Sequence, residues 1–273
     1  MTTDGHTVPR TGNGFIDVTH AALMDRVGTI RRACAKGVPR HVVVPHFDAF
    51  VDEMHAHFDH EEVIIRAAGF HRWEEHANQH AMLEQQLVRL VDYVRECDVT
   101  GDFLCTVAGT LDAALCRHEI RHDGEYAALV RSASAAPDGP DLIRWDSRYE
   151  LGIAPLDAQH RQLADCLNEL HRASLGHAPE ADVAALLEQM HDHAQAHFAM
   201  EEGVLRSVAP SRFVAHRAHH QALNAQFARV RQAVESGGLD AGVAARDFLR
   251  FWLTDHLLGS DRVAFAGGTV TRQ

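Results

Sequence analysis

Residues 47–65 read FDAFVDEMHAHFDHEEVII, and their apolar residues recur at spacings of three and four. This spacing is typical of an amphipathic helix, because it places the apolar side chains on one face. Residues 82–94, MLEQQLVRLVDYV, follow the same pattern. No segment shows the alternation of apolar and polar residues that is typical of a strand. The pattern therefore predicts an all-α protein.

Glycines and prolines that interrupt helices separate four such segments in each half of the chain. The helices predicted in the first half lie near 17–36, 40–66, 70–96 and 102–128. Those predicted in the second half lie near 157–175, 180–206, 210–235 and 240–263. Four helices with short connections favour an up-down-up-down arrangement. The sequence therefore predicts two up-down-up-down four-helix bundles in tandem.

The two halves are joined by a segment of small residues and prolines. Residues 131–140 read RSASAAPDGP, in which few side chains can pack and the prolines stop a helix. We therefore expect one domain over 1–130, a linker over 131–144 and a second domain over 145–273. A chain of 273 residues is long enough for two domains of ordinary size.

Histidine is unusually frequent, with 22 residues. Ten histidines and four carboxylate residues fall into two copies of one seven-residue template. The first copy is His20, His57, Glu61, His76, His80, His118 and Asp123. The second copy is His160, His197, Glu201, His216, His220, His256 and Asp261. The first five members are offset by 140 residues and the last two by 138, so the repeat coincides with the two predicted domains.

The spacing within the template is what metal ligands on helices require. His76 and His80 are four residues apart, as are His57 and Glu61. Side chains four apart stand on the same helix face, so both members of a pair can reach one ion. One such pair is weak evidence in a chain so rich in histidine. The recurrence of the whole template indicates a metal site in each half.

Seven ligands exceed what one ion needs, since zinc is usually satisfied by four. Two octahedral ions offer twelve coordination positions. Five histidines, two bridging carboxylates and one bridging oxide or hydroxide fill eleven of them and leave one open. Imidazole and carboxylate ligands with an open position suit iron and O2, although manganese and zinc accept the same ligands. The count predicts a dinuclear centre that binds one small molecule.

The last pair of the template is spaced differently. His118 and Asp123 are five residues apart, as are His256 and Asp261. On a regular α-helix such residues lie about 140° apart around the axis. Either the aspartate reaches sideways across the two ions, or the helix widens locally into a π-bulge.

These residues resemble the hemerythrin family, and the second half resembles bacterial hemerythrins closely. In the second half the matching motifs are IAPLDAQH (153–160), HFAMEE (197–202), HRAHH (216–220) and WLTDHLLGSD (252–261). In the first half they are FIDVTH (15–20), HFDHEE (57–62), HANQH (76–80) and HEIRHDGEY (118–126). Together these motifs are highly specific and cover nearly the whole chain.

The resemblance implies two non-haem di-iron centres with an oxo or hydroxo bridge, or four irons per chain. Three histidines in each half would hold one iron: His76, His80 and His118, and His216, His220 and His256. Two histidines would hold the other iron, whose open position takes O2: His20 and His57, and His160 and His197. The bridging carboxylates would be Glu61 and Asp123, and Glu201 and Asp261.

The two halves differ beside the open position. The family usually places an apolar residue directly after the last-helix histidine, facing the O2 pocket. Leu257 follows this rule, whereas Glu119 does not. The Glu119 carboxylate could ligate iron, compete with O2 or supply a proton, or it could turn outward to Arg121 or solvent.

Reversible O2 binding for storage, transport or buffering is the function that the resemblance implies, with nitric oxide or peroxide as further ligands. The protein would then not be an enzyme. The alternative is a di-iron oxidase or peroxidase-like enzyme in the first domain, with Glu119 as its acid. A third possibility is an O2 sensor that acts through an unidentified partner protein, because the two bundles leave no room for a signalling domain.

The composition excludes some classes of binding partner and indicates a cellular location. A net charge of -12 argues against binding to nucleic acid or to an anionic membrane. No run of about 18 apolar residues could span a bilayer, and the first residues, MTTDGHTVPR, do not form a secretory signal. The five cysteines include no CxxC pair, which is typical of reduced thiols in the cytoplasm.

Some residues near the template have uncertain roles. Glu53 and His193 stand one turn before the second-helix histidines, where they either support those ligands or face solvent. Histidines without a counterpart in the other half, such as His60 and His171, are expected on the surface.

Overall fold

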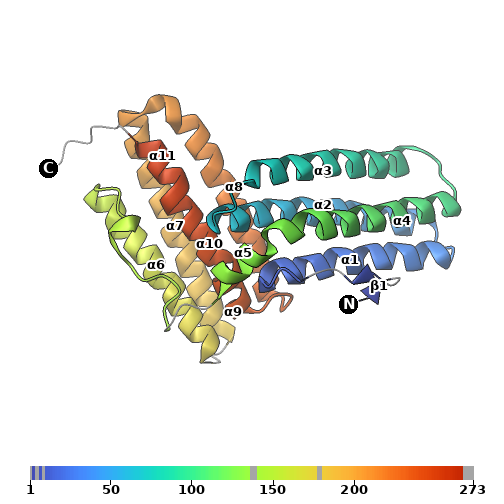
Figure 1. The fold of residues 1–273 in the computed structure, drawn as a ribbon, viewed down its shortest axis with the longest axis horizontal. Helices are drawn as coiled ribbons and strands as arrows, with labels where there is room; N and C mark the ends of the chain where they lie inside the picture. Colours follow the sequence, from blue (N-terminus) through green and yellow to red (C-terminus); the bar gives the residue numbers. More distant parts are fainter. Residues whose placement is uncertain (1, 4–5, 8–9, 136–139, 177–179, 267–273) are drawn as a thin grey trace. The chain divides into compact units, whose positions relative to one another are not determined.

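A computed structural model describes residues 2–3, 6–7, 10–135, 140–176 and 180–266 of the chain. The chain forms two compact units, Met1–Ala133 and Ser134–Gln273. Each unit is a bundle of helices, which confirms the all-α prediction (Figure 1). The described strands are two residues long, β1 (Thr2–Thr3) and β2 (His6–Thr7), and they pair antiparallel before the first helix.

The first unit contains the four predicted helices. They are α1 (Gly14–Ala35), α2 (Arg40–Ala67), α3 (Trp73–Glu96) and α4 (Gly101–His118), the last of which continues through η1 (Glu119–Asp123) into α5 (Gly124–Ser134). Helix α1 packs against α2 and α4, and α2 packs against α3, as in an up-down-up-down bundle. The Asn13 side chain begins α1 by accepting hydrogen bonds from the backbone N–H groups of Phe15 and Ile16.

The apolar stripe of residues 47–65 forms the centre of the first core. Phe47, Phe50 and Met54 of α2 are fully buried, together with Val27 of α1 and Leu111 of α4. Positions three and four apart on α2 thus face the other helices, as the periodicity predicts. The ligand candidates of α2 continue the same buried face toward its C-terminal end.

The second unit repeats this order with a more irregular last helix. Its first three helices are α6 (Ala154–Leu175), α7 (Glu180–Val208) and α8 (Pro210–Glu235), preceded by the short 3-10 helix η2 (Ser147–Tyr149). Its last helix is α9 (Ala241–Val243), η3 (Ala244–Leu249), α10 (Arg250–Asp255), η4 (His256–Ser260) and α11 (Asp261–Phe265) in succession. The segments η1, η3 and η4 are π-helical. Among the described residues, none of the helices is both long and apolar enough to cross a membrane.

The segment between the units is more ordered than the predicted linker 131–144. Helix α5 runs to Ser134, because no proline interrupts the chain before that point. Leu142 and Ile143 are buried, and the Asn168 side chain accepts from the N–H of Ile143 at 3.0 Å and donates to its carbonyl at 2.8 Å. The end of the predicted linker therefore packs on the second unit, and residues 136–139 lie outside the described part.

The expected exposure of His60 and His171 is wrong. Both side chains are buried. The ring of His60 meets the ring of Phe15 edge to face, with centroids 5.3 Å apart. A histidine can occupy an inner helix position because its ring packs as an apolar group while a ring nitrogen keeps a polar contact.

Candidate metal centres

In the first unit, all seven template residues are buried and point into the same end of the bundle. Each helix contributes: His20 from α1, His57 and Glu61 from α2, His76 and His80 from α3, and His118 and Asp123 from α4 and η1. The structure thus brings together residues that are up to 103 positions apart in the sequence. A metal ion is the partner that such a buried group of imidazoles and carboxylates fits.

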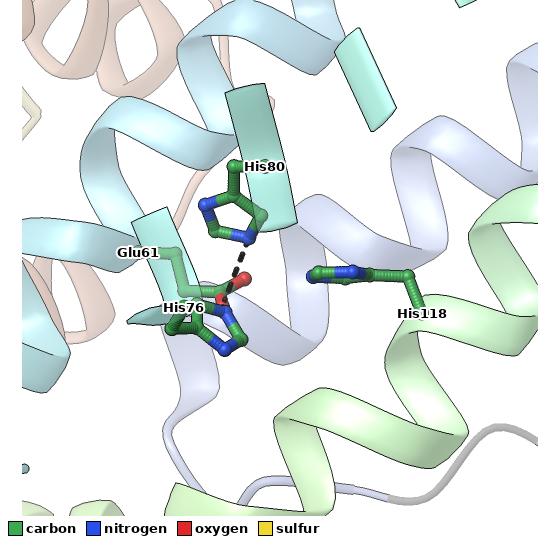
Figure 2. Close-up of side chains that lie close together, drawn as sticks. All are labelled: Glu61, His76, His80 and His118. Atoms are coloured by element: carbon green, nitrogen blue, oxygen red, sulfur yellow. Dashed lines mark hydrogen bonds and ion pairs between the residues drawn. The ribbon is translucent and has the colours of Figure 1, made fainter. Parts of the chain in front are cut away.

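The two oxygens of Glu61 face different histidines. Its Oε1 lies 2.7 Å from His76 Nε2 and 3.5 Å from His80 Nε2. Its Oε2 lies 3.0 Å from His57 Nε2 and 3.7 Å from His20 Nε2. Figure 2 shows His76 and His80 directed at this carboxylate, while His118 approaches from another helix. Glu61 therefore stands between two groups of histidines.

Asp123 divides the histidines in the same way. Its Oδ2 lies 3.3 Å from His20 Nε2. Its Oδ1 lies 3.3 Å from His118 Nε2 and 3.7 Å from His76 Nε2. One oxygen of each carboxylate thus belongs to a group of two histidines, and the other belongs to a group of three. This arrangement suits two ions bridged by two carboxylates.

The second unit gathers its seven template residues in a similar arrangement, and all are buried. Asp261 Oδ2 lies 3.5 Å from His160 Nε2, while Oδ1 lies 3.6 Å from His216 Nε2 and 3.2 Å from His256 Nδ1. The two oxygens of Glu201 divide the histidines less evenly than those of Glu61. Its Oε1 is 3.9 Å from His160, and its Oε2 lies within 3.1–3.5 Å of four histidines: His197, His216, His220 and His256.

The structure decides how the aspartates reach the sites. Residues Glu119–Asp123 and His256–Ser260 form π-helical turns. In a π-helix the backbone hydrogen bonds join residues i and i+5, so side chains five apart come closer to one face. The widened turn, and not a sideways reach from a regular α-helix, therefore brings Asp123 beside His118 and Asp261 beside His256.

Several polar atoms at both sites fit a metal ion and lack a hydrogen-bond partner among the described residues. In the first unit these include His20 Nε2, His118 Nε2 and both oxygens of Asp123. In the second they include His160 Nε2, His256 Nε2 and both oxygens of Asp261. Buried polar atoms without partners are rare, because each costs free energy. Ligand atoms of Glu61, His76, His80 and His118 lie within 4.8 Å of one another, as do those of His160, His197, Glu201 and Asp261, close enough to share an ion.

Electrostatics favours the charged form of the glutamates. Burial by itself raises the pKa of Glu61, but the charge of His80 and the nearby rings of His20, His57 and His76 outweigh it and hold the pKa well below its usual range. Burial also raises the pKa of Glu201, and hydrogen bonds from the surrounding histidines again prevail and lower it. Ionised carboxylates at these positions are the form that binds a cation.

Comparison with known proteins agrees with this geometry. The family described as "Hemerythrin HHE cation binding domain" matches residues 11–130 and again residues 151–266. The chain belongs to the hemerythrin family. Two hemerythrin domains thus stand in tandem and account for most of its length.

Individual relatives match one domain's length of the chain. A bacteriohemerythrin of Stenotrophomonas maltophilia is 29% identical over 121 residues, which cover 44% of this chain and 78% of the relative. A bacteriohemerythrin of Methylococcus capsulatus is 26% identical over 124 residues, or 45% of this chain and 93% of the relative. A hemerythrin-like protein of Naegleria gruberi is 29% identical over 124 residues, or 45% and 90%. No solved structure matches the chain significantly.

A second carboxylate supports one ligand in each hemerythrin domain. Glu62 Oε1 accepts a hydrogen bond from His80 Nδ1 at 2.9 Å, and Glu202 Oε1 accepts one from His220 Nδ1 at 3.1 Å. A proton held on Nδ1 leaves the lone pair of Nε2 free to bind a metal. The sequence analysis assigned no role to these glutamates. Their signal was present, because Glu62 and Glu202 keep the 140-residue offset of the template.

A hydroxyl fixes the ring of His57 in the same way. The Thr19 hydroxyl lies 3.1 Å from the carbonyl of Phe15 and 3.0 Å from that of Ile16, so it donates to the backbone. It must then accept from His57 Nδ1, 2.9 Å away, which directs the Nε2 lone pair toward Glu61.

Glu53 and His193 do not support the ligands. Glu53 forms a bidentate ion pair with Arg26. His193 is half-buried and contacts the side chain of Gln162 at 3.2 Å. Glu53 and His193 thus face other partners, whereas Glu62 and Glu202 lie beside ligand candidates of the neighbouring helix, His80 and His220.

Replacing Glu62 by alanine is expected to weaken iron binding in the first domain by about 10–100-fold, because the His80 ring loses its hydrogen-bond acceptor. Glu202→Ala should do the same in the second domain. Competition with a chelator measures the change. Glu84→Ala is the matched control, since Glu84 pairs with His55 away from the site. Equal iron retention in Glu62→Ala and Glu84→Ala would refute the supporting role.

The structure places Glu119 inside the first domain. Its side chain is only 3% exposed, and neither carboxylate oxygen has a hydrogen-bond partner among the described residues. The alternative that Glu119 turns outward to Arg121 or solvent is therefore wrong. Burial raises the pKa of Glu119 to about 7, against the opposing charge of His20. Leu257 occupies the corresponding position of the second domain and is also buried.

A tyrosine adds to the difference between the domains. Tyr126 is fully buried, and its ring centroid lies 5.3 Å from that of His76. The corresponding residue of the second domain is Ala264, two residues short of the 140-residue offset, as for Asp261. The sequence motif HEIRHDGEY contains Tyr126 and predicts no role for it, although the missing counterpart marks it as particular to the first domain.

Proposed function

We propose that this protein is a non-haem di-iron oxygen carrier that binds O2 reversibly at one site in each domain. Membership of the hemerythrin family and the relatives named bacteriohemerythrin support this proposal. The observation that carries it is the division of five histidines into groups of two and three around shared carboxylates. The smaller group leaves one coordination position for a small ligand.

The proposed ligands are the fourteen template residues, and a pair of irons at each site would supply the electrons that O2 takes up reversibly. The chain itself contributes imidazoles whose outer nitrogens hold protons, as at His80 and His57, and whose inner nitrogens would bind the metal. It contributes negative charge through Glu61 and Glu201. Buried surroundings exclude water, which strengthens these electrostatic contacts. Storage, transport or buffering of O2 follows from such a site, and nitric oxide or peroxide are further ligands of suitable size.

The second domain fits reversible binding better than the first. Leu257 presents an apolar side chain that cannot donate a proton or bind a metal. Glu119, in contrast, is a buried acid whose charge acts on His20, one of the two histidines on the side with the open position. A proton donor there favours further reduction of oxygen species, so oxidase or peroxidase-like chemistry is the second candidate for the first domain.

Metal analysis combined with O2 exposure tests the proposal. The protein should hold four irons per chain, and the anaerobically reduced form should develop an absorption band with O2 that disappears under vacuum. Rapid irreversible oxidation with peroxide turnover would favour the enzyme. Two zinc ions per chain in place of iron would refute both candidates.

Replacing Glu119 by leucine is expected to tighten or accelerate O2 binding at the first site by about tenfold, because a competing buried carboxylate is removed. The titration is best made in a Glu201→Gln background, in which the second site should not respond. Leu257→Glu is the reciprocal control and should weaken the second site. An unchanged O2 titration of Glu119→Leu would show that Glu119 does not act on the open position.

We also propose a cytoplasmic location. All five cysteines are free, and three of them are buried, as expected of a protein that folds in a reducing compartment. Their oxidation state in protein isolated under nonreducing conditions tests this point.

A further inference from the structure

The first domain has a groove between α3 and α4 that the proposed oxygen chemistry does not use. Its volume is about 380 Å³. The α3 wall carries Leu83, Leu87 and Leu90, and the α4 wall carries Thr110 and Ala114. The groove ends beside the ring of the ligand candidate His118. It is therefore a groove of mixed lining, with Gln79, Gln86 and His122 beside the leucines, that runs along two helices to the candidate metal site.

The second domain fills the same position with large side chains. Leu87, Thr110 and Ala114 correspond by the template offsets to Phe227, Phe248 and Trp252. All three aromatic residues are buried, and the rings of Phe227 and Trp252 meet with centroids 5.6 Å apart. Smaller side chains at the three positions leave the space in the first domain, so the groove is a difference in sequence between two otherwise similar bundles.

The charge at the end of the groove is also particular to the first domain. Arg117 and Arg121 line it, one helical turn apart, where the second domain has Asp255 and Gly259. Neither guanidinium has a carboxylate within 4.0 Å among the described residues. Two cations without a carboxylate partner in the described part of the chain, at one end of a groove that carries Leu83 and Leu90, complement an anion with an apolar tail.

We propose that this groove binds an aliphatic carboxylate, with the carboxylate at Arg117 and Arg121 and the chain along Leu83, Leu87 and Leu90. The axial distance from Leu83 to Leu90 is about 10 Å, which suits a tail of about eight carbons. A bound tail would cover the partly exposed side chains of Leu83 and Leu90 above the buried Leu87, and the arginines would select for the anionic headgroup. This inference is independent of the O2 chemistry, because none of the groove contacts requires a metal.

The test uses octanoate as the probe and the full-length protein, with isothermal titration calorimetry. Wild-type protein should bind octanoate, whereas octanol should bind about tenfold more weakly because it cannot pair with the arginines. Arg117→Gln combined with Arg121→Gln should weaken octanoate about tenfold and leave octanol unchanged. Arg89→Gln, an exposed arginine of α3 away from the groove, should change neither.

Ala114→Trp tests the shape of the groove. It introduces the residue that the second domain carries at the corresponding position, so octanoate binding should be lost. Circular dichroism checks that this variant keeps its helices. If it does not fold, the combined Arg117→Gln and Arg121→Gln variant tests whether octanoate binds in the groove. The proposal is overturned if wild-type protein does not bind octanoate at millimolar concentration, if octanol binds equally well, or if folded Ala114→Trp binds octanoate as the wild type does.

Discussion

Glu61→Gln is expected to lose both irons of the first domain and to keep the two of the second. Glu61 contacts four histidines within 3.7 Å: His20, His57, His76 and His80. Its carboxylate is the group that would neutralise two cations at once. An amide of the same shape carries no charge and directs N–H donors at lone pairs that should face the metal, so both ions lose a ligand.

The measurement is iron per chain after anaerobic reconstitution and gel filtration. Wild-type protein should hold about four irons, and Glu61→Gln and Glu201→Gln about two each, since each domain has its own full set of ligands. Glu74→Gln, on the exposed face of α3, is the control and should hold four. Four irons in Glu61→Gln would show that the carboxylate does not bridge the ions.

Trp252→Ala is expected to cost the second domain about 3–5 kcal/mol of stability. Trp252 is fully buried, and its rings contact Phe227 at 5.6 Å and Phe198 at 6.2 Å between centroids. Its Nε1 donates to the Leu223 carbonyl at 3.3 Å. Truncation removes this apolar contact, leaves a cavity and loses the indole hydrogen bond, and each of these effects is destabilising.

Hydrogen exchange resolved by peptide measures this effect domain by domain, which a single unfolding curve of a two-domain chain does not. Peptides of α6 and α8 should lose protection, while those of α1 and α2 should keep it. Trp73→Ala is the control, because Trp73 is half-buried and its ring lies against the Arg66 guanidinium. Unchanged protection in α6 and α8 would contradict the central role of Trp252 in this core.

Much of the fold was predictable because helical periodicity is a local property. The apolar spacing in residues 47–65 predicts α2, and the structure buries those side chains. The template also predicted which distant residues would gather, since one duplicated spacing constrains several helices at once. The ends of elements were less predictable. Helix α5 continues to Ser134, beyond the predicted 128, because nothing in the local sequence stops it before the prolines.

The supporting contacts were harder to predict than the ligand candidates. Glu62 reaches His80 on another helix, and Glu53 instead reaches Arg26. Both are glutamates on the same helix, and although only Glu62 has a glutamate counterpart at the 140-residue offset, the offset does not say which histidine it contacts. The partner of each depends on which neighbouring helix it faces and at what height, so it follows from packing and not from periodicity.

The sequence by itself determined the all-α class, the duplication and the fourteen ligand candidates, because these depend on residue types at fixed spacings along helices. Only the tertiary structure decided that Glu119 faces inward, that the turn before Asp123 is π-helical and that a groove lies open between α3 and α4. These features depend on how side chains of separate helices fill the space between them. A single residue such as Ala114 or Trp252 can open or close that space without changing the helical pattern.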